Sequence, residues 1–121
     1  MPRDSRLYLD DIVQAIERIR AYTKGQTEMA FGHDLKTQDA VMRNLQVIGE
    51  AALHVPGSVE ESTPEIDWRK IRALRNILVH EYFGVNLPII WDVVQNKVGP
   101  LEAACRRLLE QADSALGRES P

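Results

Sequence analysis

Apolar residues repeat with the period of a helix along the first part of the chain. Between residues 4 and 25 they stand at Leu9, Ile12, Val13, Ile16 and Ile19. This spacing places the apolar side chains on one face of an α-helix of about five turns. Asp4 or Ser5 can cap the start of this helix, and Gly25 can close its end.

A second apolar stripe runs through residues 35–55. Its members follow each other at spacings of four, three, four and three, at Val41, Leu45, Ile48, Ala52 and Val55. This pattern is typical of a helix that packs along a neighbouring helix. Gly49, inside the stripe, indicates close packing against that neighbour, and Pro56 and Gly57 end the helix.

Two polar segments beside the helices are predicted to be connectors. Residues 26–34 have the composition of a turn, with Met29 and Phe31 expected to hold the segment against the core. Residues 57–65 are predicted to form a polar loop, in which Thr63, standing before a proline, resembles the start signal of a helix.

The remaining apolar segments predict two further helices. The third begins near Asp67 and runs to Gly84. The fourth covers residues 87–98 after a cap at Asn86. The Gly-Pro pair at 99–100 is expected to interrupt or kink it, because proline lacks an amide donor and clashes with the preceding turn.

No segment alternates apolar and polar residues with the period of two that is typical of a strand. After its interruption the last helix is expected to continue and to fray from about residue 117. The sequence therefore predicts an all-α fold, an antiparallel four-helix bundle with a kinked or broken last helix, formed by a single domain over residues 1–121.

Composition excludes several classes of protein. The 121 residues are 44% hydrophobic and 27% charged, which is ordinary for a soluble globular protein and argues against disordered and fibrous classes. No apolar run approaches the roughly 20 residues that cross a bilayer. The single cysteine, Cys105, forms no internal disulfide and is expected to be a buried thiol. We therefore expect a cytoplasmic protein with no membrane contact.

The stretch RNILVHEYF, residues 75–83, places chemically active side chains on a helix with a core pattern. Arg75 and Tyr82 are seven positions apart, so they share a face of a straight helix. His80 lies about 140 degrees around the axis from Arg75, and Asn76, four positions before His80, can hydrogen-bond its imidazole. Arg75 and His80 of one chain therefore meet on one small target only if the helix deforms or a second copy completes the site.

Basic residues precede this motif at Arg69, Lys70 and Arg72, and Arg69, Arg72 and Arg75, spaced by three, form a basic ridge that leads to it. No acidic residue occurs from position 68 to 79, although the whole chain carries a net charge of −3. This local contrast indicates a polyanion such as RNA as a partner. A solvated row of arginines beside a hydrogen-bonded structural histidine is the alternative interpretation, and residue types alone do not decide between the two.

Glu50 and His54 stand four positions apart on the second predicted helix, a spacing that metal ligands can use. Two ligands do not make a site, and the Glu-x-x-His signature of di-iron bundles is absent. A hydrogen bond between the two side chains on the helix surface is therefore the preferred interpretation, and no metal site is predicted.

Together these segments resemble the HepT-like toxins of the HEPN superfamily of helical ribonucleases. RNILVHEY fits the R-x4-H-x-Y motif of that family, with Arg75, His80 and Tyr82 in the motif positions. DAVMRNLQVIGEAA, IDWRKIRALRN and the segment around Trp91 are similar as well, so the resemblance covers about residues 5–110.

The resemblance implies a metal-independent endoribonuclease without a cofactor, which acts on RNA as a homodimer and is the toxin of a type VII-like toxin–antitoxin pair. Arg75 and His80 would be catalytic, and Asn76 would orient the imidazole. The family also implies a minimal nucleotidyltransferase antitoxin that silences the toxin by transferring AMP to Tyr82, in a complex that can be larger than the dimer.

Two other classes of function stay open. A non-catalytic HEPN module would use the same ridge to hold a nucleotide, an RNA or the antitoxin without cutting RNA, so that His80→Ala would have no cleavage to abolish. For a purely structural helical partner, charge reversal of Arg72 and Arg75 would leave RNA affinity unchanged.

Overall fold

The structure is a computed structural model. It describes residues 4–80 and 86–119, and for residues 77–80 and 113–119 it describes the backbone alone. Its elements are α1 (Ser5–Thr23), α2 (Glu28–Gly32), α3 (Leu35–Ala52), α4 (Gly57–Ser62), α5 (Trp68–His80), α6 (Leu87–Asp92), the π-helical segment η1 (Val93–Lys97) and α7 (Val98–Glu119). Residues 4–80 and 86–119 contain no strand, which confirms the all-α class. In these ranges no helix has the length and apolar character needed to cross a bilayer.

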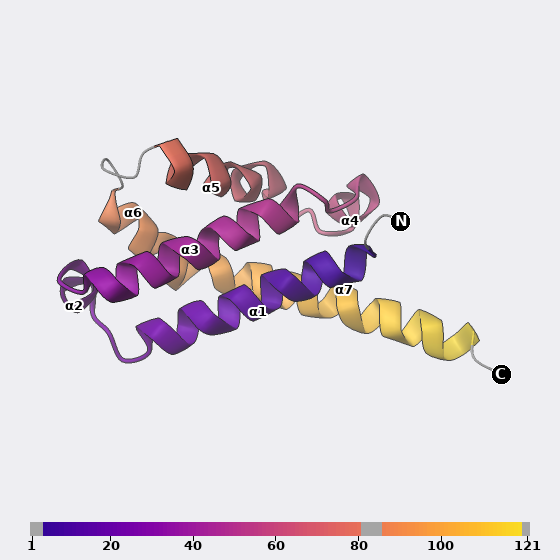
Figure 1. The fold of residues 1–121 in the computed structure, drawn as a ribbon. Coiled ribbons are helices and arrows are strands. Elements are labelled where there is room, and N and C mark those ends of the chain that lie inside the picture. The colour runs from indigo at the N-terminus through magenta and orange to yellow at the C-terminus, as the bar shows by residue number, and fades with distance from the viewer. Residues whose placement is uncertain (1–3, 81–85, 120–121) are drawn as a thin grey trace.

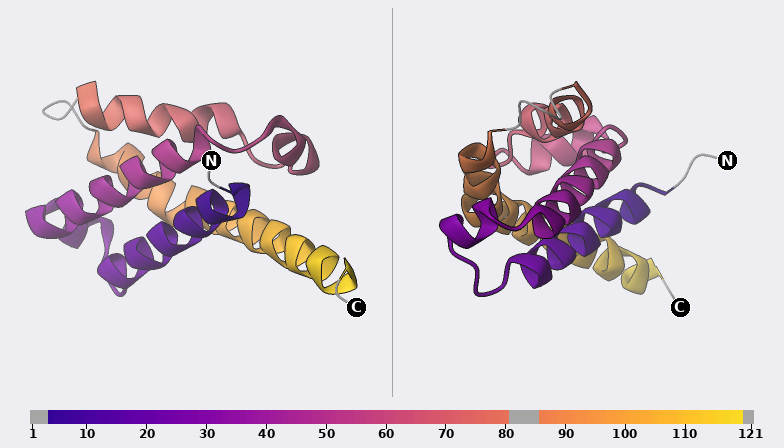
Figure 2. Two further views of the ribbon diagram at one scale, coloured as in Figure 1. Left: turned by 45° about the vertical axis from the view of Figure 1, so that its right-hand side comes forward. Right: turned by 60° about the vertical axis from the view of Figure 1, so that its left-hand side comes forward.

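The long helices run in alternating directions (Figure 1). α3 contacts α1 on one side and α5 on the other, and α7 packs along α1. The two turned views show the same order, with α1 and α5 on opposite sides of α3 (Figure 2). The predicted antiparallel bundle is therefore confirmed, and α5, which carries the Arg75 motif, has its main contact with α3.

The core is built from the two apolar stripes. Every residue of the two predicted stripes is at most 8% exposed. α3 ends at Ala52, three residues before the predicted end, so Val55 is buried but lies beyond the helix. Asp4 caps α1, and hydrogen bonds from the side chain and the backbone of Arg6 lower the pKa of its carboxyl. Gly25, just past the helix, has a φ of 75°, a conformation that favours glycine. The predicted boundaries of the first helix are therefore confirmed.

Charged side chains join α7 to α1 beside the core. Glu102 on α7 is 7% exposed, and it pairs with Arg20 of α1 and with Arg106. Arg106 also donates from Nη2 to Oε1 of Glu17 at 2.6 Å, and its hydrogen bonds to Glu102 and Glu17 raise its pKa. The buried carboxylate of Glu102 thus has two cationic partners, which offset the cost of removing its charge from water.

Both predicted connectors contain a short helix that the sequence did not indicate. α2 lies within residues 26–34, and α4 lies within residues 57–65, where a polar loop was predicted. Helices of five and six residues are too short for a periodic pattern to reveal them. Phe31 is buried as predicted, whereas Met29 is 75% exposed, so Phe31 alone of these two side chains holds the first connector to the core.

The interruption in the last helix lies in the turn before the Gly-Pro pair. Asn86 caps α6 as predicted, by accepting a hydrogen bond from the Ile89 N–H at 3.3 Å. α6 then passes through η1 into α7, and the Val98 N–H donates to the carbonyl of Val93, five residues back. Pro100 follows one turn later, and the carbonyl four residues before it, that of Asn96, lies within η1, so the π-helical turn stands where the proline ring crowds the preceding turn, as predicted. α7 continues to Glu119, past the point where the sequence predicts fraying.

Candidate functional site

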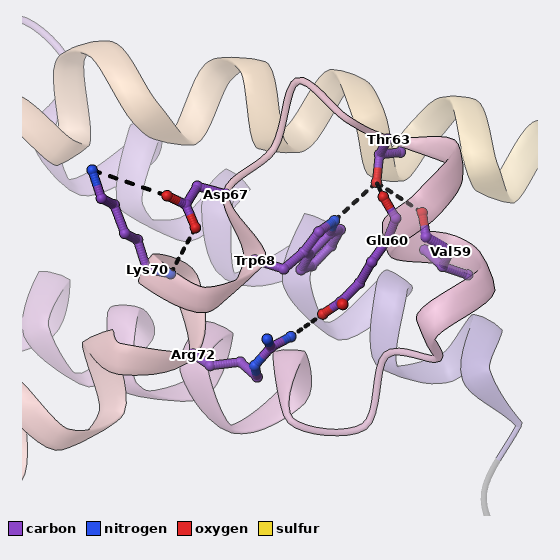
Figure 3. A network of polar contacts seen from close by, with 7 residues as sticks. All are labelled: Val59, Glu60, Thr63, Asp67, Trp68, Lys70 and Arg72. Atoms are coloured by element: carbon purple, nitrogen blue, oxygen red, sulfur yellow. Dashed lines mark hydrogen bonds and ion pairs between the residues drawn. The ribbon is translucent and has the colours of Figure 1, made fainter.

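The start of α5 is anchored to α4 by buried hydrogen bonds (Figure 3). Trp68 is 3% exposed, and its Nε1–H donates to Oγ1 of Thr63 at 2.8 Å. The fully buried Thr63 hydroxyl donates in turn to the carbonyl of Val59 at 2.8 Å. Asp67 caps α5 by accepting from the Lys70 N–H, so α5 begins where predicted, although Thr63 ends α4 instead of starting α5.

The middle of α5 touches α3 at a glycine. A Cβ built on Gly49 would lie 2.8 Å from the backbone nitrogen of Arg75 and 3.0 Å from its Cβ. A side chain at this position would therefore push the two helices apart. The close packing predicted at Gly49 is confirmed, and it fixes the backbone of Arg75 against α3.

Glu50, the next residue on α3, pairs with the Arg75 guanidinium. Nε of Arg75 lies 2.6 Å from Oε1 of Glu50, and the side chains are 44% and 47% exposed. Such an exposed pair contributes roughly 0–1 kcal/mol to stability, so its main effect is to orient the guanidinium. Within the described part of the chain no carboxylate other than Glu50 occupies the planar fork, whose terminal nitrogens suit a phosphate oxygen.

α5 is helical from Arg75 through Asn76 to His80. Asn76 is exposed on the helix, four positions before His80, as the proposed support of the imidazole requires. As far as His80 the helix is uninterrupted, so positions 75 and 80 lie about 140 degrees apart around its axis and a straight α5 does not bring both onto one small target. The side chain of His80 and the whole of Tyr82 lie outside the described residues, so their roles stay predictions.

The predicted basic ridge carries carboxylates on its flank (Figure 3). Arg72 pairs with Glu60 of α4, and Nζ of Lys70 lies 4.0 Å from Oδ2 of Asp67. Arg69 is exposed and has no carboxylate partner in the described residues. These carboxylates offset part of the positive charge of the ridge. The contribution of Glu60 was not predicted, because Glu60 lies on α4, in a segment that was predicted to be a loop.

The predicted hydrogen bond between Glu50 and His54 is wrong. α3 ends at Ala52, so His54 lies beyond the helix, and its ring stacks on Tyr8 of α1 with centroids 4.5 Å apart and planes at 17°. Glu50 pairs instead with Arg75, a partner on another helix that no local pattern identifies. No group of three or more possible ligands among the described residues is arranged to hold a metal ion.

Cys105 belongs to the core, as predicted. The side chain is fully buried, and burial, with a smaller effect of the nearby Glu102 charge, raises the pKa of its thiol to about 12. A thiol with this pKa is almost entirely protonated at neutral pH, so it is a poor nucleophile.

Comparison with known proteins places these features in a family. Residues 12–108 match the family model described as Ribonuclease HepT-like. A protein of Thermococcus cleftensis named probable ribonuclease HepT is 38% identical over 108 residues, which cover 89% of this chain and 98% of that protein. A putative RNase of Methanocaldococcus jannaschii is 43% identical over 99 residues, covering 81% and 82% of the two chains.

Two further matches extend the comparison. A longer Methanocaldococcus jannaschii protein, named gamma-glutamylcyclotransferase and putative RNase, is 36% identical over 93% of this chain, which spans 51% of its length. Among solved structures, the tri-AMPylated Shewanella oneidensis HEPN toxin in complex with MNT antitoxin is similar in fold, with a TM-score of 0.63 and 26% identity. That match covers 92% of this chain and 99% of the toxin.

Proposed function

This chain belongs to the ribonuclease HepT-like family, and from that premise we propose that it is the endoribonuclease toxin of a toxin–antitoxin pair, with Arg75 and His80 as its catalytic residues. The observation that carries the proposal is the exposed Arg75 guanidinium, oriented by Glu50 on a helix whose backbone continues through Asn76 to His80. Arg69, Lys70 and Arg72 on the same helix would guide the RNA backbone by charge.

The proposed reaction requires no metal ion, because RNA carries its own nucleophile. The 2′-hydroxyl attacks the adjacent phosphorus and the 5′-oxygen leaves, which gives a 2′,3′-cyclic phosphate and a 5′-hydroxyl. His80, whose ordinary pKa is near 6.5, takes or gives the proton at neutral pH. Arg75 stabilises the charge that grows on the phosphate oxygens in the transition state.

The proposed active form is a homodimer. Positions 75 and 80 lie about 140 degrees apart around the axis of α5, so each site would take Arg75 from one copy and His80 from the other. α5 has its main contact with α3, which supports an approach of the second copy from the other side of α5.

The proposed regulator is a minimal nucleotidyltransferase antitoxin. The related Shewanella oneidensis HEPN toxin is tri-AMPylated in its complex with the MNT antitoxin, which supports AMP transfer to this chain. Tyr82, in the motif position, is the proposed acceptor. A nucleotidyl group there would add bulk and negative charge next to the motif and would compete with the RNA phosphate.

Cleavage assays on purified protein test the catalytic proposal. The wild type is expected to cut RNA with EDTA present, and His80→Ala and Arg75→Ala are each expected to lower the rate by about 100-fold or more. His33→Ala, which changes an exposed histidine on the α2–α3 connection, is the matched control and should keep full activity.

Two further measurements sharpen this test. A 2′-deoxy substitution at the cleaved nucleotide should abolish cleavage, because it removes the proposed nucleophile. If the purified wild type binds RNA but never cuts it, the chain is a binding module and the catalytic proposal is wrong.

Mass spectrometry of the intact protein tests the proposed modification. After co-expression with the reading frame next to its own gene, the mass of the wild type should rise by adenylyl groups, and the mass of Tyr82→Phe should not.

A further inference from the structure

A groove lined by both polar and apolar side chains lies between the start of α1 and the second half of α3. It measures about 310 Å³ and has Tyr8 and Asp11 of α1 on one side and Arg43, Gln46 and Glu50 of α3 on the other. This volume falls at the lower end of the roughly 300–1,000 Å³ typical of small-molecule sites, so the groove suits one compact group and not a length of chain.

The groove adjoins the proposed phosphate site through a shared residue. Glu50 lines the groove and also holds the guanidinium of Arg75, with 2.6 Å between Oε1 and Nε. A group bound in the groove therefore lies against the side chain that orients Arg75. In a nucleotide, the base and the phosphate are likewise separated only by the ribose.

A stacked pair of aromatic rings, the aromatic platform, lines the groove. The Tyr8 and His54 rings are stacked at 4.5 Å with their planes 17° apart, and both side chains line the groove. His54 is exposed, so a further ring can stack on the pair. Protein sites for single-stranded RNA characteristically stack unpaired bases on aromatic rings.

The groove presents hydrogen-bonding side chains to the edge of a base. The Glu50 carboxylate that lines it is paired with Arg75, so Glu50 adds no uncompensated negative charge. The exposed Arg43 and half-buried Gln46 side chains have no hydrogen-bond partner within the described residues, and both offer donors to a base edge.

From these observations we propose that the α1–α3 groove is a subsite for one nucleobase of the RNA, next to the phosphate held by Arg75. The base stacks on the Tyr8–His54 pair and is recognised at its edge by Arg43 and Gln46. This inference rests on the proposed function, since it places the base relative to a phosphate at Arg75. The groove would then select the nucleotide that lies next to the cleaved bond.

An abasic substrate tests the subsite. After the cut in a short RNA has been mapped, the base on each flanking nucleotide is removed in turn while its ribose and phosphate stay. For one position, the wild type should lose about tenfold in kcat/KM, mainly through KM, because stacking of a base is lost. For His54→Ala and Tyr8→Leu, which have already lost the platform, removal of the same base should change kcat/KM little.

Matched variants separate the groove from general effects. His33→Ala and Tyr22→Leu change exposed rings away from the groove and should respond to base removal as the wild type does. Wild-type cleavage that is insensitive to base removal at every flanking position would overturn the inference. So would groove variants that cleave and bind RNA normally but lose the antitoxin complex, because the groove would then be a protein interface.

The inference can fail separately from the proposed function. Binding of the intact and abasic RNAs to His80→Ala, followed by fluorescence anisotropy, needs no cleavage. A weaker Kd for the abasic RNA, abolished by adding His54→Ala, supports the subsite even if the wild type never cuts RNA. Equal Kd values for the two RNAs overturn it, whatever the cleavage assays give.

Discussion

Among single residues, Glu50 has two opposing effects on Arg75. Its carboxylate fixes the guanidinium by a contact of 2.6 Å, and it also lowers the positive charge available to an RNA phosphate. Both side chains are nearly half exposed, so solvent screens the pair and little folding stability depends on it. The orientation of the guanidinium matters more for catalysis than for substrate binding. A misplaced donor still attracts the bound RNA by charge, but it loses its hydrogen bond to the transition state.

We therefore predict that Glu50→Gln lowers kcat for RNA cleavage by about tenfold without raising KM. The free energy of unfolding should change by less than about 1 kcal/mol. Steady-state kinetics and urea unfolding measure the two quantities. Glu61→Gln, which removes the same charge from an exposed position on α4, is the control. Equal kcat values for Glu50→Gln and the wild type would contradict an orienting role.

Among the elements, the contact of α3 with α5 sets the position of the motif helix. The backbone nitrogen of Arg75 lies 2.8 Å from the point that a Cβ on residue 49 would occupy, and only a glycine leaves that point empty. The Trp68–Thr63 hydrogen bond holds the start of the same helix. A flexible side chain could turn away from an added methyl group, but a backbone nitrogen cannot. The approach of the two helices must therefore change if Gly49 is replaced.

Gly49→Ala is predicted to destabilise the protein by roughly 1–3 kcal/mol, the usual cost of overpacking. This is opposite to the gain of about 1 kcal/mol that alanine gives over glycine in an unconstrained helix. The cleavage rate should fall as well, since Arg75 moves with α5. Urea unfolding checks the sign, with Gly32→Ala as the control, where an added Cβ meets no atom within 4 Å. A more stable Gly49→Ala would contradict the close contact.

The long elements were predictable because burial imposes a period on the sequence. The stripes ending at Ile19 and Val55 repeat often enough to identify α1 and α3, while α2 and α4 are shorter than two periods. The motif residue Arg75 was found from its family pattern, but its pairing with Glu50 joins two helices and left no local signal. Met29 was misplaced because an apolar residue type does not by itself determine burial.

At the scale of the whole molecule, the proposed site is divided between two copies. α5 lies on the far side of α3 from α1, so much of its surface is not covered by the long helices of its own bundle (Figures 1 and 2). Ile89 on α6, the next described element along the chain, is 58% exposed. An approach of a second copy along this side would cover apolar surface and bring two α5 helices together.

Mixing two inactive variants tests this division. Arg75→Ala and His80→Ala should each be inactive alone. When the two variants are mixed in equal amounts, half of the dimers contain one copy of each. In such a dimer, one of the two sites keeps both Arg75 and His80. Co-refolded protein should therefore recover about a quarter of the wild-type cleavage rate. Size-exclusion chromatography with mass detection should give twice 13.7 kDa for every sample. A dimer without recovery would mean that Arg75 and His80 of one chain serve the same site, because only then does every mixed dimer lack an intact pair.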